Sequence, residues 1–150
     1  MSVVIRHGSL QEVVSVIAQI KEFARGESVA SLAQRLDDKQ DVLILVAEDN
    51  KQLLGFKIGY QVDQHVFYSW LGGVSPIARK KGVAQQLLDW QEAWVCKHNY
   101  SDLKVKSRNQ FPGMLRLLIR NGYQIEDYER MDPIEESRIH FTKMLIDQVR

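Results

Sequence analysis

The sequence predicts an α/β or α+β domain, in which helices cover a mixed β-sheet. Three observations lead to this class. β-branched and aliphatic runs alternate with segments of helical periodicity, the expected order is β, α, α, β, β, β, α, β, α, β, β, and no linker-like or repetitive stretch divides the chain. We therefore expect residues 1–150 to form one domain.

The first elements are a short strand and a capped helix. Val3–Ile5 is β-branched and predicts the strand. Ser9 followed by Glu12 three positions later is a capping box, in which each side chain satisfies a free main-chain N–H of the other residue. Apolar residues then recur at helical spacing, and we expect this helix to end near Arg25 and Gly26.

The next segment predicts a second helix and then three strands. Ser28 is placed to cap a short helix. The runs 42–48 and 53–60 flank a polar turn, so we expect them to pair antiparallel. The aromatic run 65–71 predicts a further strand, which leads into Gly72 and Gly73.

The second half alternates helices and strands. Residues 83–94 carry apolar side chains on one helical face, and 103–107 alternate apolar with basic residues, as in a strand with one wet side. Pro112 opens a helix that Gly122 ends. Strands are expected around Tyr123 to Ile125 and at 139–145.

Composition excludes several classes of protein. The 20 basic and 19 acidic side chains give a net charge of +1, which removes a global electrostatic argument for nucleic acid. The longest apolar run, 42–47, is far too short to span a membrane, and the start of the chain lacks an export signal. Cys96 is the only cysteine, so an internal disulfide is excluded and a cytoplasmic location is expected.

The most informative segment runs from Gly72 to Ala84, where a strand ends, a basic turn follows and a helix begins at Gly82. The first amides of a helix lack intrahelical partners and carry the positive end of its dipole, so the turn is suited to a pyrophosphate. The predicted phosphate-binding residues are Arg79, Lys80, Lys81, Gly82, Val83 and Ala84.

This segment resembles the acetyl-CoA signature of the GCN5-related N-acetyltransferases. The pattern Arg79-x-x-Gly82-x-Ala84 follows Val74-x-Pro76 at the spacing of that family. Asn109 before the next helix and Gly122-Tyr123 after it resemble the family's second segment, which adds Asn109 to the predicted cofactor-binding residues.

The resemblance implies a central, mostly antiparallel sheet that is splayed between its fourth and fifth strands, with helices on both faces. Pantetheine would enter the gap and pair with main-chain groups around Gly73 and Val74, which adds these two residues to the predicted cofactor-binding set. A neutral amine of a small molecule, peptide or protein would then attack the acetyl thioester directly. Acetyl-CoA is then the cosubstrate, and no metal is expected. The tyrosine acid of many family members is replaced by Leu118, so no catalytic residue is assigned. Five other residues are candidates for the missing acid or base, but the spacing supports none of them: Tyr68, Tyr60, Glu48, His65 and Tyr123.

Two alternatives stay open. A noncatalytic acyl-CoA-binding or regulatory module would also carry the phosphate turn and would explain Leu118. A nucleic-acid-binding domain would use the basic strand 104–108, although the same residues would surround the exit of CoA. The acceptor and the oligomeric state are not specified by the sequence, and a homodimer formed through sheet edges is one alternative.

Overall fold

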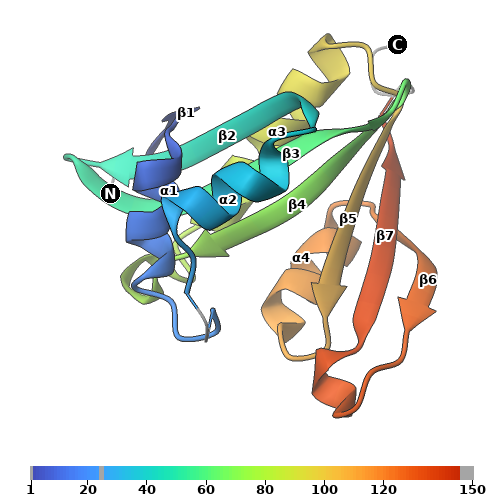
Figure 1. Ribbon diagram of the computed structural model, residues 1–150. Helices are drawn as coiled ribbons and strands as arrows, with labels where there is room; N and C mark the ends of the chain where they lie inside the picture. Colours follow the sequence, from blue (N-terminus) through green and yellow to red (C-terminus); the bar gives the residue numbers. More distant parts are fainter. Residues whose placement is uncertain (1, 24–25, 146–150) are drawn as a thin grey trace.

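The computed structural model describes residues 2–23 and 26–145. These residues contain one seven-stranded sheet of order β1-β2-β3-β4-β5-β7-β6, in which the contact between β4 and β5 is parallel and the others described are antiparallel (Figure 1). The strands are β1 Val4–His7, β2 Gln40–Asp49, β3 Gln52–Asp63, β4 Val66–Val74, β5 Asp102–Arg108, β6 Gln124–Glu129 and β7 Arg138–Met144. The mixed, mostly antiparallel sheet confirms the predicted fold class.

Helices cover both faces of this sheet, and two buried clusters lie beneath them. The helices are α1 Leu10–Ile17, α2 Val29–Leu36, α3 Val83–Lys97 and α4 Pro112–Arg120. Side chains from α3 and α4 share one apolar cluster, and side chains from α1 and α2 share the other (Figure 1). The α3/α4 face and the α1/α2 face are therefore separate environments for any residue on the sheet.

The helix starts agree with the sequence, and one helix end does not. Ser9 and Glu12 form the predicted capping box, and Ser28 caps α2 through the main-chain N–H of Ser31. The expected extension of the first helix to Gly26 is wrong, because α1 ends at Ile17 and is followed by turns. Arg25 lies outside the described residues. Ile20 is still buried, so the apolar spacing reflected burial rather than a continuous helix.

The predicted hairpin of the second and third strands is confirmed by an antiparallel register that runs from Gln40 opposite Gln61 to Asp49 opposite Gln52. Two short 3₁₀ helices, Pro76–Ala78 and Ile134–Glu136, were not expected from the sequence. Within the described part of the chain, no helix has the length and apolarity needed to cross a membrane.

The sheet opens between β4 and β5, as the resemblance implies. The parallel pairing joins residues 66–69 to residues 102–105 and then stops. β4 nevertheless continues to Val74 along β3, and β5 continues to Arg108 along β7. The two halves of the sheet diverge beyond this point (Figure 1). An unpaired edge of β4 therefore faces the gap directly before the basic turn.

Candidate active site

The basic turn enters α3 through two left-handed residues. Lys80 has φ +61°, and Gly82, which caps the helix, has φ +81°. Glycine adopts this region without steric cost, whereas other residues are strained there. A Cβ built on Gly82 meets nothing within 4 Å, so the space in front of the helix is open.

The main-chain donors of this turn are free. Among the described residues, no hydrogen-bond acceptor is found for the main-chain N–H groups of residues 80–85, and the first helical bond joins Gln86 N to Gly82 O at 3.0 Å. The turn brings together five of the predicted phosphate-binding residues: Lys80, Lys81, Gly82, Val83 and Ala84. Unpaired amides at a helix N-terminus favour an anion.

Arg79, also a predicted phosphate ligand, is bonded within the protein. Its guanidinium forms an ion pair with Glu22 at 3.1 Å, and its Nε donates to the carbonyl oxygen of Val74 at 3.3 Å. The hydrogen bond from Arg79 lowers the pKa of Glu22. The side chain therefore joins the turn to the segment that follows α1.

The end of β4 presents alternate main-chain groups to the gap. Ser75 N donates to Leu54 O of the neighbouring strand at 2.8 Å. Because such groups alternate along an antiparallel pair, Gly73 faces β3 as Ser75 does, and Gly72 and Val74 face the gap. A Cβ on Gly73 would lie 2.8 Å from Ile20 Cδ1, so its lack of a side chain is explained by packing. Contact of Gly73 with the cofactor stays a prediction.

In the second segment that resembles the family, Asn109 and Tyr123 form hydrogen bonds within the protein. Asn109 Nδ2 donates to Ile134 O at 3.0 Å, and cofactor binding by Asn109 stays a prediction. Tyr123 is buried, and its hydroxyl donates to Glu92 of α3 at 2.8 Å.

Comparison with known proteins decides the family. The family model described as an acetyltransferase (GNAT) domain matches residues 7–146. The chain belongs to the GNAT acetyltransferase family. No curated protein sequence matches it.

Solved structures show the same GNAT fold at low sequence identity. The ribosomal-protein-S18-alanine N-acetyltransferase from Escherichia coli superposes with a TM-score of 0.82 at 16% identity, over 96% of this chain and 94% of that one. The PaiA N-acetyltransferase from Thermoplasma acidophilum, in complex with coenzyme A, gives 0.76 at 19%, over 96% and 99%. A GNAT acetyltransferase from Elizabethkingia anophelis with acetyl-CoA bound gives 0.73 at 18%, over 95% and 98%.

This GNAT domain lacks the usual tyrosine acid, because an apolar residue, Leu118, stands at that position. Leu118 is 0% exposed and belongs to the α3/α4 cluster. Of the substitutes considered from the sequence, Tyr60 and Tyr68 contact each other on the opposite, α1/α2 face, with ring centroids 5.6 Å apart. Burial raises the pKa of Tyr68.

The α1/α2 face also carries a group of cations near these tyrosines. Arg35 lies over the ring of Trp70 at 4.6 Å and donates to the hydroxyl of Tyr60 at 3.3 Å. Lys106 of β5 lies 5.7 Å from the ring centroid of Tyr68. Trp70 has no register partner on β3, so a bulge lies where β4 separates from β5. The sequence indicated Tyr60, Tyr68 and the basic strand of Lys106 separately, but it gave no sign that they lie together, because they come from distant segments.

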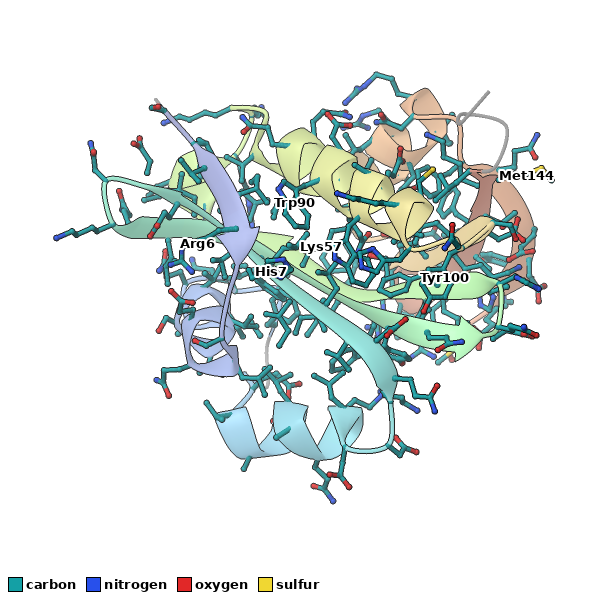
Figure 2. All side chains as sticks on the ribbon, turned by 90° about the horizontal axis from the view of Figure 1, so that it is seen from above. Arg6, His7, Lys57, Trp90, Tyr100 and Met144 are labelled. Atoms are coloured by element: carbon teal, nitrogen blue, oxygen red, sulfur yellow. The ribbon has the colours of Figure 1, made fainter. Side chains whose placement is uncertain are left out.

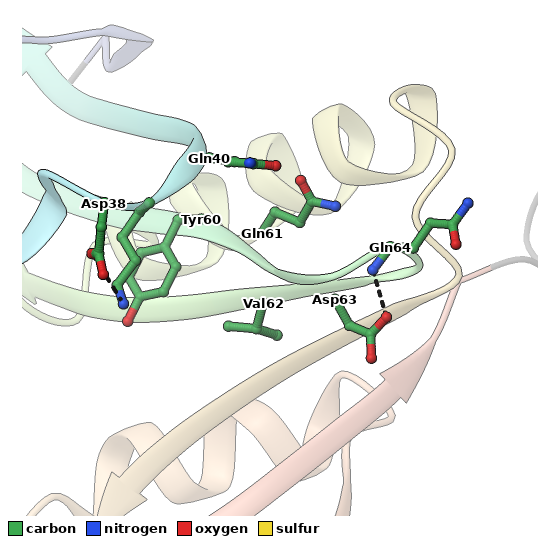
Figure 3. Close-up of a pocket in the computed structure, with 8 residues that line it drawn as sticks. Asp38, Gln40, Tyr60, Gln61, Val62, Asp63 and Gln64 are labelled. Atoms are coloured by element: carbon green, nitrogen blue, oxygen red, sulfur yellow. Dashed lines mark hydrogen bonds and ion pairs between the residues drawn. The ribbon is translucent and has the colours of Figure 1, made fainter.

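A polar hollow of about 340 Å³ lies beyond Tyr60, at the end of β3 that is remote from the basic turn. Its lining is drawn in Figure 3: Asp38, Lys39, Gln40, Tyr60, Gln61, Val62, Asp63 and Gln64. Two acidic side chains, Asp38 and Asp63, line it together with Lys39, and it borders the closed end of the β4–β5 pair. It is therefore distinct from the gap in this GNAT domain.

The described residues contain no cluster of the ligands that metal ions need. In residues 2–23 and 26–145, no group of three or more His, Cys, Asp or Glu side chains is positioned to hold a metal ion.

Proposed function

We propose that this protein is an acetyl-CoA-dependent N-acetyltransferase that acts on an amine of a small molecule, peptide or protein. One observation carries the proposal: the β4–β5 pairing ends after Ser69, and the unpaired edge of β4 leads directly to the free amides of residues 80–85. A strand edge can pair with an extended amide chain, and free helix amides can bind its diphosphate. Acetyl-CoA contains both parts, because its extended pantetheine chain is attached directly to a diphosphate.

In this proposal the residues have separate tasks. The amides of the turn bind the diphosphate, and Lys80 and Lys81 add positive charge. Gly72 and Val74 offer main-chain groups to pantetheine and to the developing oxyanion. The neutral amine then attacks the thioester carbonyl, and catalysis comes mainly from positioning the two reactants. Because the α3/α4 face is filled around Leu118, the acceptor approaches from the α1/α2 face, past Trp70 and Tyr68.

Isothermal titration with acetyl-CoA tests the cosubstrate. We expect saturable binding with one site and a dissociation constant in the micromolar range. No heat of binding at high micromolar acetyl-CoA would overturn the proposal.

A second candidate, a noncatalytic acyl-CoA-binding or regulatory module, is favoured by Leu118 and by residues 69–71, where many family members carry a carboxylate and this chain has none. A panel of primary amines, with release of CoA as the measurement, separates the candidates. We expect at least one amine to stimulate release above the rate of hydrolysis, whereas binding of acetyl-CoA with no release in any panel would support the module. A cytoplasmic location and a homodimer stay predictions.

A further inference from the structure

Lys57 is a buried lysine in the middle of β3, and the proposed chemistry above makes no use of it. It is 7% exposed, and among the described residues its ammonium forms no hydrogen bond or ion pair, although it keeps some contact with solvent. Lysine is almost never buried without a partner, because losing hydration penalises the charge. Burial lowers the pKa of Lys57 to about 8.

The strand pattern places Lys57 on the α3/α4 face. Its neighbours Phe56 and Ile58 belong to the α1/α2 cluster, and side chains alternate along a strand. In Figure 2, Lys57 lies between the strands and α3, on the same side as Trp90. Lys57 thus shares its face with Leu118, the position at which many family members have their acid.

Glycines around Lys57 set the course of its side chain. Gly55 and Gly59 lie two residues away on the same strand face, and α3 packs closely on both: Cβ atoms there would lie 3.2 Å from Leu87 Cδ1 and 3.1 Å from Gln91 Nε2. Across the sheet, Lys57 is opposite Gly72 of β4. A Cβ on Gly72 would lie 3.6 Å from Lys57 Cγ and 3.8 Å from its Nζ. The lysine therefore extends over Gly72, toward the gap between β4 and β5.

We propose that Lys57 is the proton donor to the departing thiolate of CoA. This inference rests on the proposed function. As the amine nitrogen bonds to the acetyl carbon, the C–S bond breaks and its electron pair goes to sulfur. The Nζ–H bond of Lys57 then breaks and the proton moves to sulfur, which gives CoA thiol and a neutral lysine. Solvent takes the excess proton of the amine and later returns one to Lys57, so the step balances.

The charged surroundings of Lys57 are simple. β2 and β4 place Leu45 and Gly72 opposite it, and neither is charged. From α3, the charge of Glu92 favours the ammonium form, although Glu92 is bonded to Tyr123 and Lys143. The amide of Gln91 is buried and finds no partner in the described part of the chain. A thiolate in the gap would be a further compensating anion for Lys57.

The first test titrates the thiol of bound CoA and needs no acceptor amine. Thiolate absorbance in the far ultraviolet is followed against pH for CoA bound to the wild type, to Lys57→Met and to the neighbouring control Gln91→Met. An adjacent ammonium favours thiolate only while it is charged, so below about pH 8 the wild type and Gln91→Met are expected to show more bound thiolate, and hence a lower apparent thiol pKa, than free CoA at the same pH. Lys57→Met should show no more thiolate than free CoA. Equal values in all three proteins would overturn the inference.

The second test measures turnover with the best amine of the panel. Lys57→Met is expected to lower kcat about 100-fold with the acetyl-CoA affinity unchanged. The wild-type kcat should fall above about pH 8, as Lys57 loses its proton, and this limb should be absent from Lys57→Met. Lys57→Arg keeps the charge but not a transferable proton, so it should retain the low thiol pKa and lose turnover.

The outcomes separate this inference from the proposed function. Wild-type kcat and an unchanged alkaline limb in Lys57→Met would overturn the role of Lys57 and leave the acetyltransferase standing. Failure of the wild type to bind CoA would overturn both. Thermal unfolding monitors the fold; removal of an unpaired buried charge is expected to keep or raise the melting temperature, and Lys57→Arg provides a second variant.

Discussion

The two segments that resemble the GNAT signature differ in what their polar groups do. In the basic turn, the amides of residues 80–85 have no partner in the described protein, and the space before Gly82 is open. In the second segment, Asn109 is bonded to Ile134, and Tyr123 is bonded to Glu92. The first segment leaves its main-chain donors open, as a proposed ligand site requires, whereas the polar groups of the second are used within the protein.

The difference teaches that a sequence motif can be kept for two physical reasons. Gly82 would let main-chain donors approach a ligand, because it caps α3 at a positive φ with no side chain in the way. Tyr123 fills the α3/α4 cluster, and its hydroxyl completes a buried network with Glu92 and Lys143, whose ion pair measures 3.0 Å. Substitutions in the two segments should therefore separate affinity from stability.

The largest effect is expected at Gly82. In Gly82→Val, the branched side chain enters the open space and the left-handed φ is strained, so the amides should lose the diphosphate. We expect the dissociation constant for acetyl-CoA to rise about 100-fold, or ~2.7 kcal/mol, by isothermal titration.

The matched control is Gly122→Val. Gly122 also has a positive φ, +87°, and a Cβ there makes only an ordinary contact with Lys143 at 3.9 Å. It should carry the same backbone strain, ~1–2 kcal/mol of stability, with acetyl-CoA affinity within about twofold of the wild type. Equal loss of affinity in both variants would contradict the distinction between the segments.

A smaller effect, on stability alone, is expected at Tyr123. Tyr123→Phe removes the hydrogen bond to Glu92 and keeps the ring in the core. A hydrogen bond to a charged group contributes ~1.5 kcal/mol or more, so the free energy of unfolding in urea should fall by about that amount. Acetyl-CoA affinity should not change. A tenfold weaker affinity with normal stability would instead place Tyr123 in the binding site.

The sequence was most informative where one local rule decides the structure. The capping box at Ser9 and Glu12 is confirmed, as is the position of the strand that opens the gap. The end of the first helix was missed, because Ile20 continues the apolar spacing although the chain has already turned. Burial and helicity leave the same mark on such short segments.

The site could be predicted only as far as the main chain decides it. Free amides follow from a helix start at Gly82, which the sequence reveals. The contact of Arg79 with Glu22 joins residues 57 positions apart, and the course of Lys57 over Gly72 depends on the strand register. Lys57 did carry a signal, since it interrupts the apolar run 53–60, but the run alone does not tell which face is wet or which neighbour is glycine.

The smallest predicted effect concerns Arg79, which lies between the two behaviours. Its charge belongs to the basic turn, but its guanidinium is paired with Glu22, just as the side chain of Asn109 is bonded to Ile134. Glu22→Gln removes the competing carboxylate and frees the guanidinium for a phosphate. A partly exposed ion pair is worth less than ~1 kcal/mol, so we expect acetyl-CoA affinity to increase about threefold by isothermal titration.

Glu27→Gln is the matched control for this change, because it removes one negative charge from the same segment, and the bond that Glu27 makes is to Ser31 rather than to Arg79. It should shift the affinity by less than half as much, and added salt should abolish that shift because exposed charges at this distance are screened. If both variants gained equally, the effect would come from net charge alone. If Glu22→Gln bound acetyl-CoA more weakly than the wild type, the ion pair would instead hold Arg79 in the position from which it contacts the phosphates, and the turn would depend on the segment after α1 for its charge as well as its shape.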